Sequence, residues 1–167
     1  NGVHAVDTLD GKEYQIKSKV VVNATGVFVD DVMKMDECDT RRKVRPSQGV
    51  HLVVDSKFLG GRSALMIPKT KDGRVLFGVP WHGKVVLGTT DTPLNEASLE
   101  PRALEEEVDF ILDQAGQYLD RKPTRADVLS IFAGLRPLAA PTHADSKKTK
   151  EISRNHKIYR SKSGLLT

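Results

Sequence analysis

The N-terminal third of the chain predicts a hairpin, a buried strand and a short helix. Residues 3–8 and 13–18 flank Asp10-Gly11, a dipeptide typical of a two-residue hairpin turn. The run from Val20 to Ala24 is apolar apart from one asparagine. Such a run is typical of a strand buried on both faces, as in a parallel sheet. Residues 28–36 then show the apolar spacing of a short helix.

The middle of the chain predicts an antiparallel meander. Glycine-containing turns at 71–73 and 81–83 separate consecutive runs with strand-like composition, which is typical of strands joined by hairpins. The expected strands cover residues 44–55, 63–69, 74–80 and 84–89.

One long helix is predicted at 101–119. Pro101 suits a first helical turn, and apolar residues follow at helical spacing as far as Leu119. Its exposed face is expected to carry a row of carboxylates, which an anionic membrane would repel. We therefore expect any membrane attachment to lie outside this segment. The carboxylates are Glu105, Glu106, Glu107, Asp109 and Asp113.

The C-terminal part predicts a strand at 128–138, a polar surface loop at 139–150 and a hairpin of 151–160 with 164–167. Together the elements indicate an α+β fold class, an antiparallel mixed sheet with flanking helices. The first 38 residues are expected to belong to a different, partly parallel sheet.

Composition narrows the class of protein. The chain has 167 residues, 38% hydrophobic and 29% charged, which suits one globular domain or one domain with part of another. A net charge of +4 permits an anionic ligand, but no basic run with interleaved aromatics indicates nucleic acid. The single Cys38 excludes an internal disulfide and multi-cysteine metal sites, and no metal is expected. The start at Asn1 without an initiator Met, and the stop within an apolar run, predict an excised fragment.

Ala24-Thr25-Gly26 is the first candidate for chemistry, because small residues after a buried strand let the backbone approach a ligand closely. Many buried strands end this way without binding anything. The chain contains no Gly-x-Gly-x-x-Gly turn, so it cannot hold a dinucleotide pyrophosphate in the usual way.

Arg136 interrupts an otherwise apolar strand between Gly134 and Pro137. A buried arginine needs a partner, because an unpaired buried charge is very costly. An internal ion pair is the commoner explanation, and a phosphate or carboxylate ligand is the other.

His51 and Thr90 each allow two interpretations. His51 lies among apolar strand residues, where a histidine is more often a satisfied core residue but can also be a general base. Thr90 lies in the polar end of a strand, at 88–92, where the hydroxyls either stabilise a turn or face a ligand.

Taken in order and spacing, several segments resemble the aerobic, FAD-dependent glycerol-3-phosphate dehydrogenases, a family whose electrons pass to a quinone. The likeness covers nearly the whole chain. It is carried by residues 21–26 and 29–30, 44–54, 66–70 and 72–77, 79–81, 88–93, 132–138 and 151–154.

This resemblance implies a two-domain flavoprotein. Residues 1–38 would be a partial FAD-binding, Rossmann-like segment, and 39–167 a substrate-binding cap truncated at its C-terminus. Ala24, Thr25 and Gly26, together with Gly49, would lie near the FAD. The glycine-rich stretches of the family would lie outside this chain, so we expect the isolated chain to be inactive.

The resemblance also implies the reaction, in which sn-glycerol 3-phosphate is oxidised at C2 to dihydroxyacetone phosphate with hydride transfer to FAD. His51 would be the base, and Arg136 a catalytic residue that also binds substrate. Arg136 and Arg154 would hold the phosphate, while Thr90 would position substrate or flavin. One departure is Gln48, where many relatives have lysine.

Two alternatives stay open. One is another FAD-dependent oxidoreductase of the superfamily, acting on an amino acid or hydroxy acid. The other is a non-enzymatic β-rich binding domain. For the parent protein, the resemblance implies a cytoplasmic location, peripheral at the inner face of the cell membrane, and allows a homodimer.

Overall fold

The structure is a computed structural model that describes residues 2–37, 41–140 and 156–167. The chain divides into two compact units, and each is described by itself. One unit comprises Asn1–Arg45 with Pro137–Thr167, and the other is Pro46–Arg136. The expected domain boundary after residue 38 stays a prediction, because compactness alone does not say which unit binds a cofactor.

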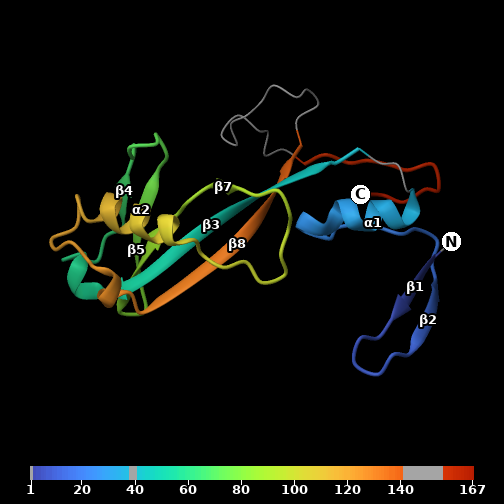
Figure 1. The fold of residues 1–167 in the computed structure, drawn as a ribbon, viewed down its shortest axis with the longest axis horizontal. Coiled ribbons are helices and arrows are strands. Elements are labelled where there is room, and N and C mark those ends of the chain that lie inside the picture. Colours follow the sequence, from blue (N-terminus) through green and yellow to red (C-terminus); the bar gives the residue numbers. More distant parts are fainter. Residues whose placement is uncertain (1, 38–40, 141–155) are drawn as a thin grey trace. The chain divides into compact units, whose positions relative to one another are not determined.

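The second unit is built on the predicted antiparallel meander (Figure 1). The described residues form a six-stranded sheet in the order β4-β5-β6-β3-β7, and β8 also pairs with β3. The predicted strand at 63–69 is shorter than expected, and it ends where Pro68 lacks the N–H needed for further pairing. The strands are β3 (Val44–Asp55), β4 (Leu65–Ile67), β5 (Leu76–Trp81), β6 (Lys84–Gly88), β7 (Thr92–Pro93) and β8 (Ser130–Ala139).

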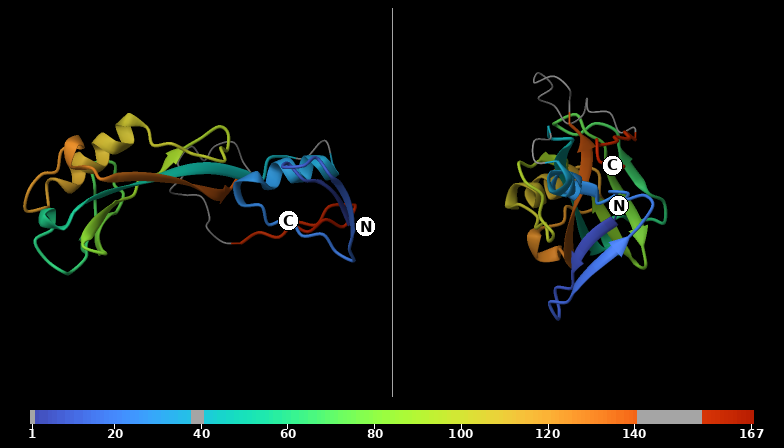
Figure 2. Two further views of the ribbon diagram at one scale, coloured as in Figure 1. Left: turned by 90° about the horizontal axis from the view of Figure 1, so that it is seen from below. Right: turned by 90° about the vertical axis from the view of Figure 1, so that its right-hand side faces the viewer.

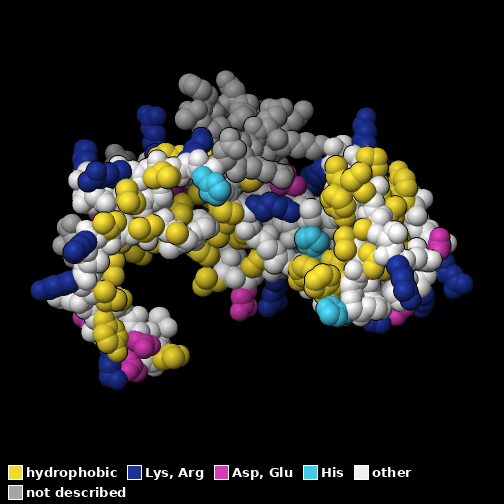
Figure 3. Space-filling view, turned by 180° about the vertical axis from the view of Figure 1, so that it is seen from behind, with side chains coloured by type: hydrophobic (Ala, Val, Ile, Leu, Met, Phe, Trp, Pro, Cys, Tyr) yellow, Lys and Arg dark blue, Asp and Glu magenta, His cyan; other side chains and the backbone are white. Residues whose placement is uncertain are grey.

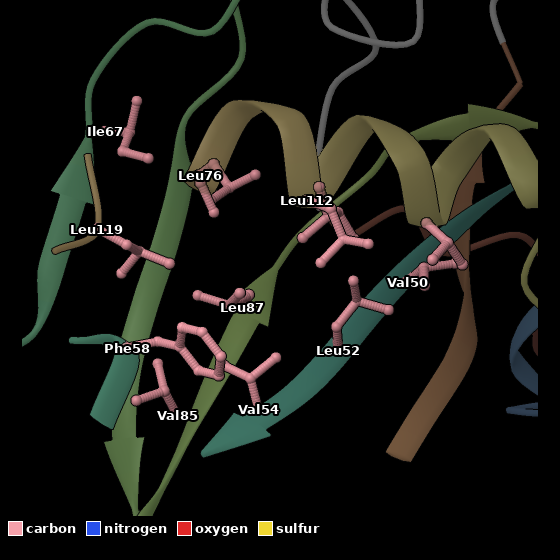
Figure 4. Close-up of a cluster of buried hydrophobic side chains, with 13 residues drawn as sticks. Val50, Leu52, Val54, Phe58, Ile67, Leu76, Val85, Leu87, Leu112 and Leu119 are labelled. Carbon is pink, nitrogen blue, oxygen red and sulfur yellow. The ribbon is translucent and has the colours of Figure 1, made fainter. Parts of the chain in front are cut away.

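Helix α2 (Glu105–Ala115) covers one face of this sheet (Figure 2). Side chains alternate between the two faces of a strand, and in β3 Val50, Leu52 and Val54 are fully buried beneath α2. Figure 4 shows these three side chains in one cluster with Leu112 of α2. The core therefore lies between α2 and one face of the sheet. The β3 residues that alternate with the core residues point to the opposite face.

The opposite side of the unit carries apolar side chains that reach solvent. Met66 of β4 and Phe77, Val79 and Trp81 of β5 are between 38% and 63% exposed. Hydrophobic side chains gather over this unit at the right of Figure 3. Only one face of the meander is thus covered by the helix.

The first unit contains the predicted hairpin and helix. Strands β1 (Gly2–Val6) and β2 (Glu13–Lys17) pair antiparallel, and α1 spans Val29–Asp36 after a 3-10 turn at Gly26–Phe28. The hairpin loop is longer than the two residues expected. Backbone N–H groups of Leu9 and Lys12 donate to the Asp7 and Asp10 carboxylates, which stabilises a wider loop.

The expected buried strand at 20–24 is wrong. Val20 and Val22 are 55% and 66% exposed, and the segment makes one isolated parallel bridge, between Val22 and Leu166. A strand is buried on both faces only when neighbouring elements cover both. Within the described part of the chain this segment has no such cover, and the polar Asn23 is its buried residue.

The long helix differs from its prediction in both bounds and in one buried residue. It spans Glu105–Ala115 instead of 101–119, and Glu107 is buried at 5% exposure instead of joining the solvated acidic face. The first turn explains the burial, because the Glu107 carboxylate accepts a hydrogen bond from the Leu104 N–H and is thereby turned inward.

The C-terminal hairpin is confirmed for its described part. Arg160 and Leu166 form an antiparallel bridge, and the Gly164 N–H donates to the Ser161 carbonyl in the predicted turn. Residues 151–155, and most of the expected loop at 139–150, lie outside the described residues.

Candidate functional site

Two strands of the second unit present the candidate site on the sheet face opposite α2. In β3, Ser47, Gly49 and His51 alternate with the residues that enter the core. In β8, Phe132 and Arg136 are four residues apart and so share one face. The alternation of both strands brings His51 and Arg136, predicted separately from the sequence, to the same side of the sheet.

His51 is half-buried and packed between an aromatic ring and a glycine. Its imidazole stacks on Phe132, with ring centroids 5.0 Å apart and planes 12° from parallel. Gly88 lies opposite on β6, and a Cβ there would come 2.2 Å from His51 Cδ2, so only glycine leaves room for the ring. Burial, and then the charge of Arg136, hold the pKa of His51 below its ordinary value. The imidazole is therefore neutral at neutral pH and able to accept a proton.

Arg136 lies across the backbone of Gly49, where an added Cβ would sit 2.3 Å from Nη2. Its Nη1 donates to the Thr90 carbonyl at 3.1 Å, and its Nη2 donates to Thr89 Oγ1 at 3.0 Å. Asp91 Oδ1 lies 3.7 Å from Nη1, a long ion pair. The side chain remains 32% exposed. Arg136 thus has the internal partner expected of a structural arginine and an open side that can face a ligand.

The Thr90 hydroxyl is directed away from this face. Its Oγ1 accepts from the Val50 N–H at 3.0 Å and donates to Glu107 Oε1 at 2.9 Å, and the residue is 2% exposed. The expected contact of Thr90 with substrate or flavin stays a prediction. Because the hydroxyl is engaged inside the protein, such a role would depend on the Thr90 carbonyl, which holds Arg136.

Glu107 is a buried carboxylate with neutral hydrogen-bond donors on both oxygens. Oε1 accepts from Thr90 and Thr92 Oγ1, and Oε2 accepts from Gln48 Nε2 and the Leu104 N–H. Burial by itself would raise the pKa of Glu107, but these hydrogen bonds outweigh it and hold that pKa below its ordinary value. The carboxylate is therefore charged at neutral pH.

The Ala24-Thr25-Gly26 turn belongs to the first unit. Thr25 Oγ1 donates to Asn23 Oδ1 at 2.7 Å, and Asn23 Nδ2 donates to the Val29 carbonyl at 2.9 Å. The three turn residues are exposed, and an added Cβ on Gly26 would meet nothing within 4 Å. The surface above the turn is thus open enough for a ligand to approach the backbone.

Arg154, the second expected phosphate ligand, lies outside the described residues. Thr89, Phe132 and Glu107 were missed as site residues. The period-two alternation of a strand could have placed Phe132 on the same face as Arg136. Glu107 gave no such signal, because it lies in a run of carboxylates typical of a solvated helix face. Among the described side chains, no group of three or more His, Cys, Asp or Glu could hold a metal ion.

The sheet with its exposed histidine–arginine face is an FAD-dependent oxidoreductase architecture. Residues 1–157 match the family of FAD dependent oxidoreductases, and the chain belongs to that family. Similar proteins indicate which members of that family the chain resembles. The chain is 44% identical to the mitochondrial glycerol-3-phosphate dehydrogenase SDP6 of Arabidopsis thaliana, over 99% of the chain and 26% of that protein. It is 43% identical to the mitochondrial glycerol-3-phosphate dehydrogenase of Bos taurus, over 100% of the chain and 23% of that protein.

A solved structure shares the fold. The glycerol-3-phosphate dehydrogenase from Bacillus halodurans, complexed with FAD, superposes with a TM-score of 0.81 at 38% identity. The match covers 99% of this chain and 31% of that one. The predicted fold class and the resemblance to glycerol-3-phosphate dehydrogenases are confirmed. The chain spans about a quarter of the length of these curated relatives.

Two of the curated relatives described above carry "mitochondrial" in their names, which gives no support to the expected cytoplasmic location. In the ranges that the structure describes, every helix is too short or too polar to cross a bilayer.

Proposed function

We propose that the complete protein containing this chain oxidises sn-glycerol 3-phosphate to dihydroxyacetone phosphate. The observation that carries the proposal is the shared face of His51 and Arg136, which pairs a neutral base with a partly exposed guanidinium. Relatives named as glycerol-3-phosphate dehydrogenases support the choice of substrate. The isolated chain is proposed to be inactive.

Arg136 would bind the phosphate of the substrate. Its guanidinium is oriented by the Thr90 carbonyl and the Thr89 hydroxyl, and it faces Asp91 only at 3.7 Å. A phosphate dianion is a stronger partner than such a long ion pair, and a guanidinium matches phosphate oxygens in two parallel hydrogen bonds. Arg154 is proposed as the second phosphate ligand.

His51 would remove the proton of the C2 hydroxyl at an imidazole nitrogen. The low pKa of His51 keeps that nitrogen free to accept it. Protonation would place a second positive charge near Arg136, and the bound phosphate would offset this repulsion. The phosphate would thus stabilise the imidazolium that forms when the neutral His51 accepts the proton.

FAD, when bound, would accept the hydride from C2. The exposed Ala24-Thr25-Gly26 turn fits a cofactor contact, because its surface is open. The Cα of Gly49 is covered by Arg136, so Gly49 would contact a cofactor through its remaining backbone atoms. We further propose a quinone as electron acceptor and a peripheral position at a membrane.

The test is a substrate panel on the complete, FAD-loaded protein with an artificial electron acceptor. Glycerol 3-phosphate should be oxidised and yield dihydroxyacetone phosphate, whereas glycerol, a 2-hydroxy acid and an amino acid should react at least about 100-fold more slowly in kcat/KM. Preference for the hydroxy acid or the amino acid would favour the alternative oxidoreductase. A protein inactive with every substrate would favour a binding domain.

Titration of the isolated chain with FAD tests the proposal that this chain alone is inactive. Weak or absent quenching of flavin fluorescence is expected, because the chain lacks a glycine-rich pyrophosphate turn. Tight stoichiometric binding would show that these residues suffice for the cofactor, contrary to the proposal.

A further inference from the structure

The peptide that holds Arg136 is itself held from the interior by a buried carboxylate. Thr90 accepts from Arg136 through its carbonyl and donates to Glu107 through its hydroxyl. We propose that Glu107 is a positioning residue, which fixes the Thr90 peptide and thereby orients the Arg136 guanidinium toward the phosphate. This inference rests on the function proposed above.

The contacts of Glu107 tie together three segments of the second unit. Gln48 belongs to β3, Thr90 lies in the β6–β7 connection, Thr92 begins β7, and Leu104 precedes α2. Every donor points at a carboxylate oxygen, and hydrogen bonds to a charged group are the stronger kind. The carboxylate is thus the common point that fixes the β6–β7 connection against β3 and the helix.

Thr90 has little freedom while Glu107 is present. Its Oγ1 both accepts from the Val50 N–H and donates to Glu107, so its side-chain torsion is set from two directions. Without the carboxylate, the Thr92 and Thr90 hydroxyls would need new acceptors in a buried place. The connection would then shift, and the Thr90 carbonyl and Thr89 hydroxyl would shift with it, away from the guanidinium.

Gln48 adds a second observation. Its Nε2 donates to Glu107 Oε2 at 2.7 Å and to the Arg102 carbonyl at 3.0 Å, on the α2 side of the sheet. The position where many relatives are expected to carry lysine therefore faces Glu107. A lysine there would also place its donor group on that side, so either residue can serve the same carboxylate.

The experiment compares variants of the complete, FAD-loaded protein. Glu107→Ala should raise the KM for glycerol 3-phosphate about tenfold, the worth of one hydrogen bond to a charged group, while kcat changes less than about threefold. Thr90→Val, which keeps the carbonyl but removes the link to Glu107, should raise KM similarly. Glu107→Gln should restore KM to near the wild-type value, because threonine hydroxyls can turn to accept from its amide.

Gln114→Ala is the matched control. Gln114 lies on the same helix, is 4% exposed, and its Oε1 accepts from the Lys71 N–H in a loop remote in sequence from Arg136. It should lower the melting temperature as Glu107→Ala does and leave KM unchanged. If Glu107→Ala does not fold, Thr90→Val decides the question, because it breaks the same link from the other side.

Three results would overturn the inference. An unchanged KM in Glu107→Ala and Thr90→Val would make Glu107 a purely structural residue. An equal rise of KM in Gln114→Ala would show general loosening of the helix instead of a specific link. A wild-type protein without glycerol 3-phosphate oxidation would overturn the proposed function, and this inference with it.

Discussion

Gly49→Ala should separate binding of the phosphate from stability of the fold. The added Cβ would lie 2.3 Å from Arg136 Nη2 and 2.7 Å from both Cζ and Nη1. Non-bonded heavy atoms settle at roughly 3.5 Å or more, so the guanidinium has to withdraw by about 1.2 Å. That displacement breaks the hydrogen bonds to the Thr90 carbonyl and Thr89 Oγ1, now 3.1 and 3.0 Å long.

The expected cost falls on substrate affinity. One lost hydrogen bond to a charged group is worth about 1.5–3 kcal/mol, or roughly 10- to 150-fold in KM for glycerol 3-phosphate. Folding stability should change by less than about 1 kcal/mol, because the displaced atoms are the mobile end of a partly exposed side chain. Steady-state kinetics and thermal unfolding of the complete, FAD-loaded protein measure the two effects.

Gly61→Ala is the matched control, since Gly61 is exposed, lies outside β3 and β8, and an added Cβ there would meet nothing within 4 Å. It should leave both KM and stability unchanged. An unchanged KM in Gly49→Ala would refute the phosphate role of the guanidinium. Loss of bound flavin at unchanged KM would instead indicate that Gly49 contacts the cofactor, as the family resemblance implies.

Three further predictions follow from the same geometry. Gly88→Ala forces a contact of 2.2 Å with His51 Cδ2, so kcat should fall by about 100-fold, and near-normal turnover would remove His51 as the base. The charge of Arg136 adds to burial in lowering the pKa of His51, so Arg136→Ala should move the acidic limb of the kcat/KM profile to higher pH. Arg136→Lys keeps the charge and should leave the limb in place, and a limb that stays fixed in both variants would mean that another group titrates. Gln48→Leu removes a hydrogen-bond donor from the buried Glu107 carboxylate and should lower the free energy of unfolding in urea by about 1–3 kcal/mol. The same change at the exposed Gln117 should cost about zero, and equal costs would show that the buried hydrogen bond adds nothing to stability.

Sequence patterns predicted those elements whose stability comes from nearby residues. The meander and β3 (Val44–Asp55) were found because turn residues and strand composition are local. The segment at 20–24 was mispredicted because an apolar run does not reveal whether other elements cover it. The widened loop at 7–12 depends on side chains of Asp7 and Asp10 accepting from the backbone, and such contacts compete with the tight turn.

The candidate site could be predicted in part. His51 and Arg136 stood out because each interrupts an apolar strand, and the alternation of side chains in β3 and β8 brings them to one face. Glu107 was assigned to solvent because it lies in an acidic run, and the sequence does not reveal which carboxylate of that run turns inward. Its burial depends on Thr90 and Gln48, which reach it only after the sheet and helix have packed.

The most direct test of the central claim is anaerobic reduction of the flavin in the complete protein by glycerol 3-phosphate. The wild-type protein should lose its flavin absorbance at a saturable rate. Arg136→Ala should need at least about tenfold more substrate for half of its maximal rate, as expected for the loss of a charged phosphate contact. Unchanged absorbance in the wild type, or the same concentration dependence in both proteins, would contradict a phosphate site at Arg136.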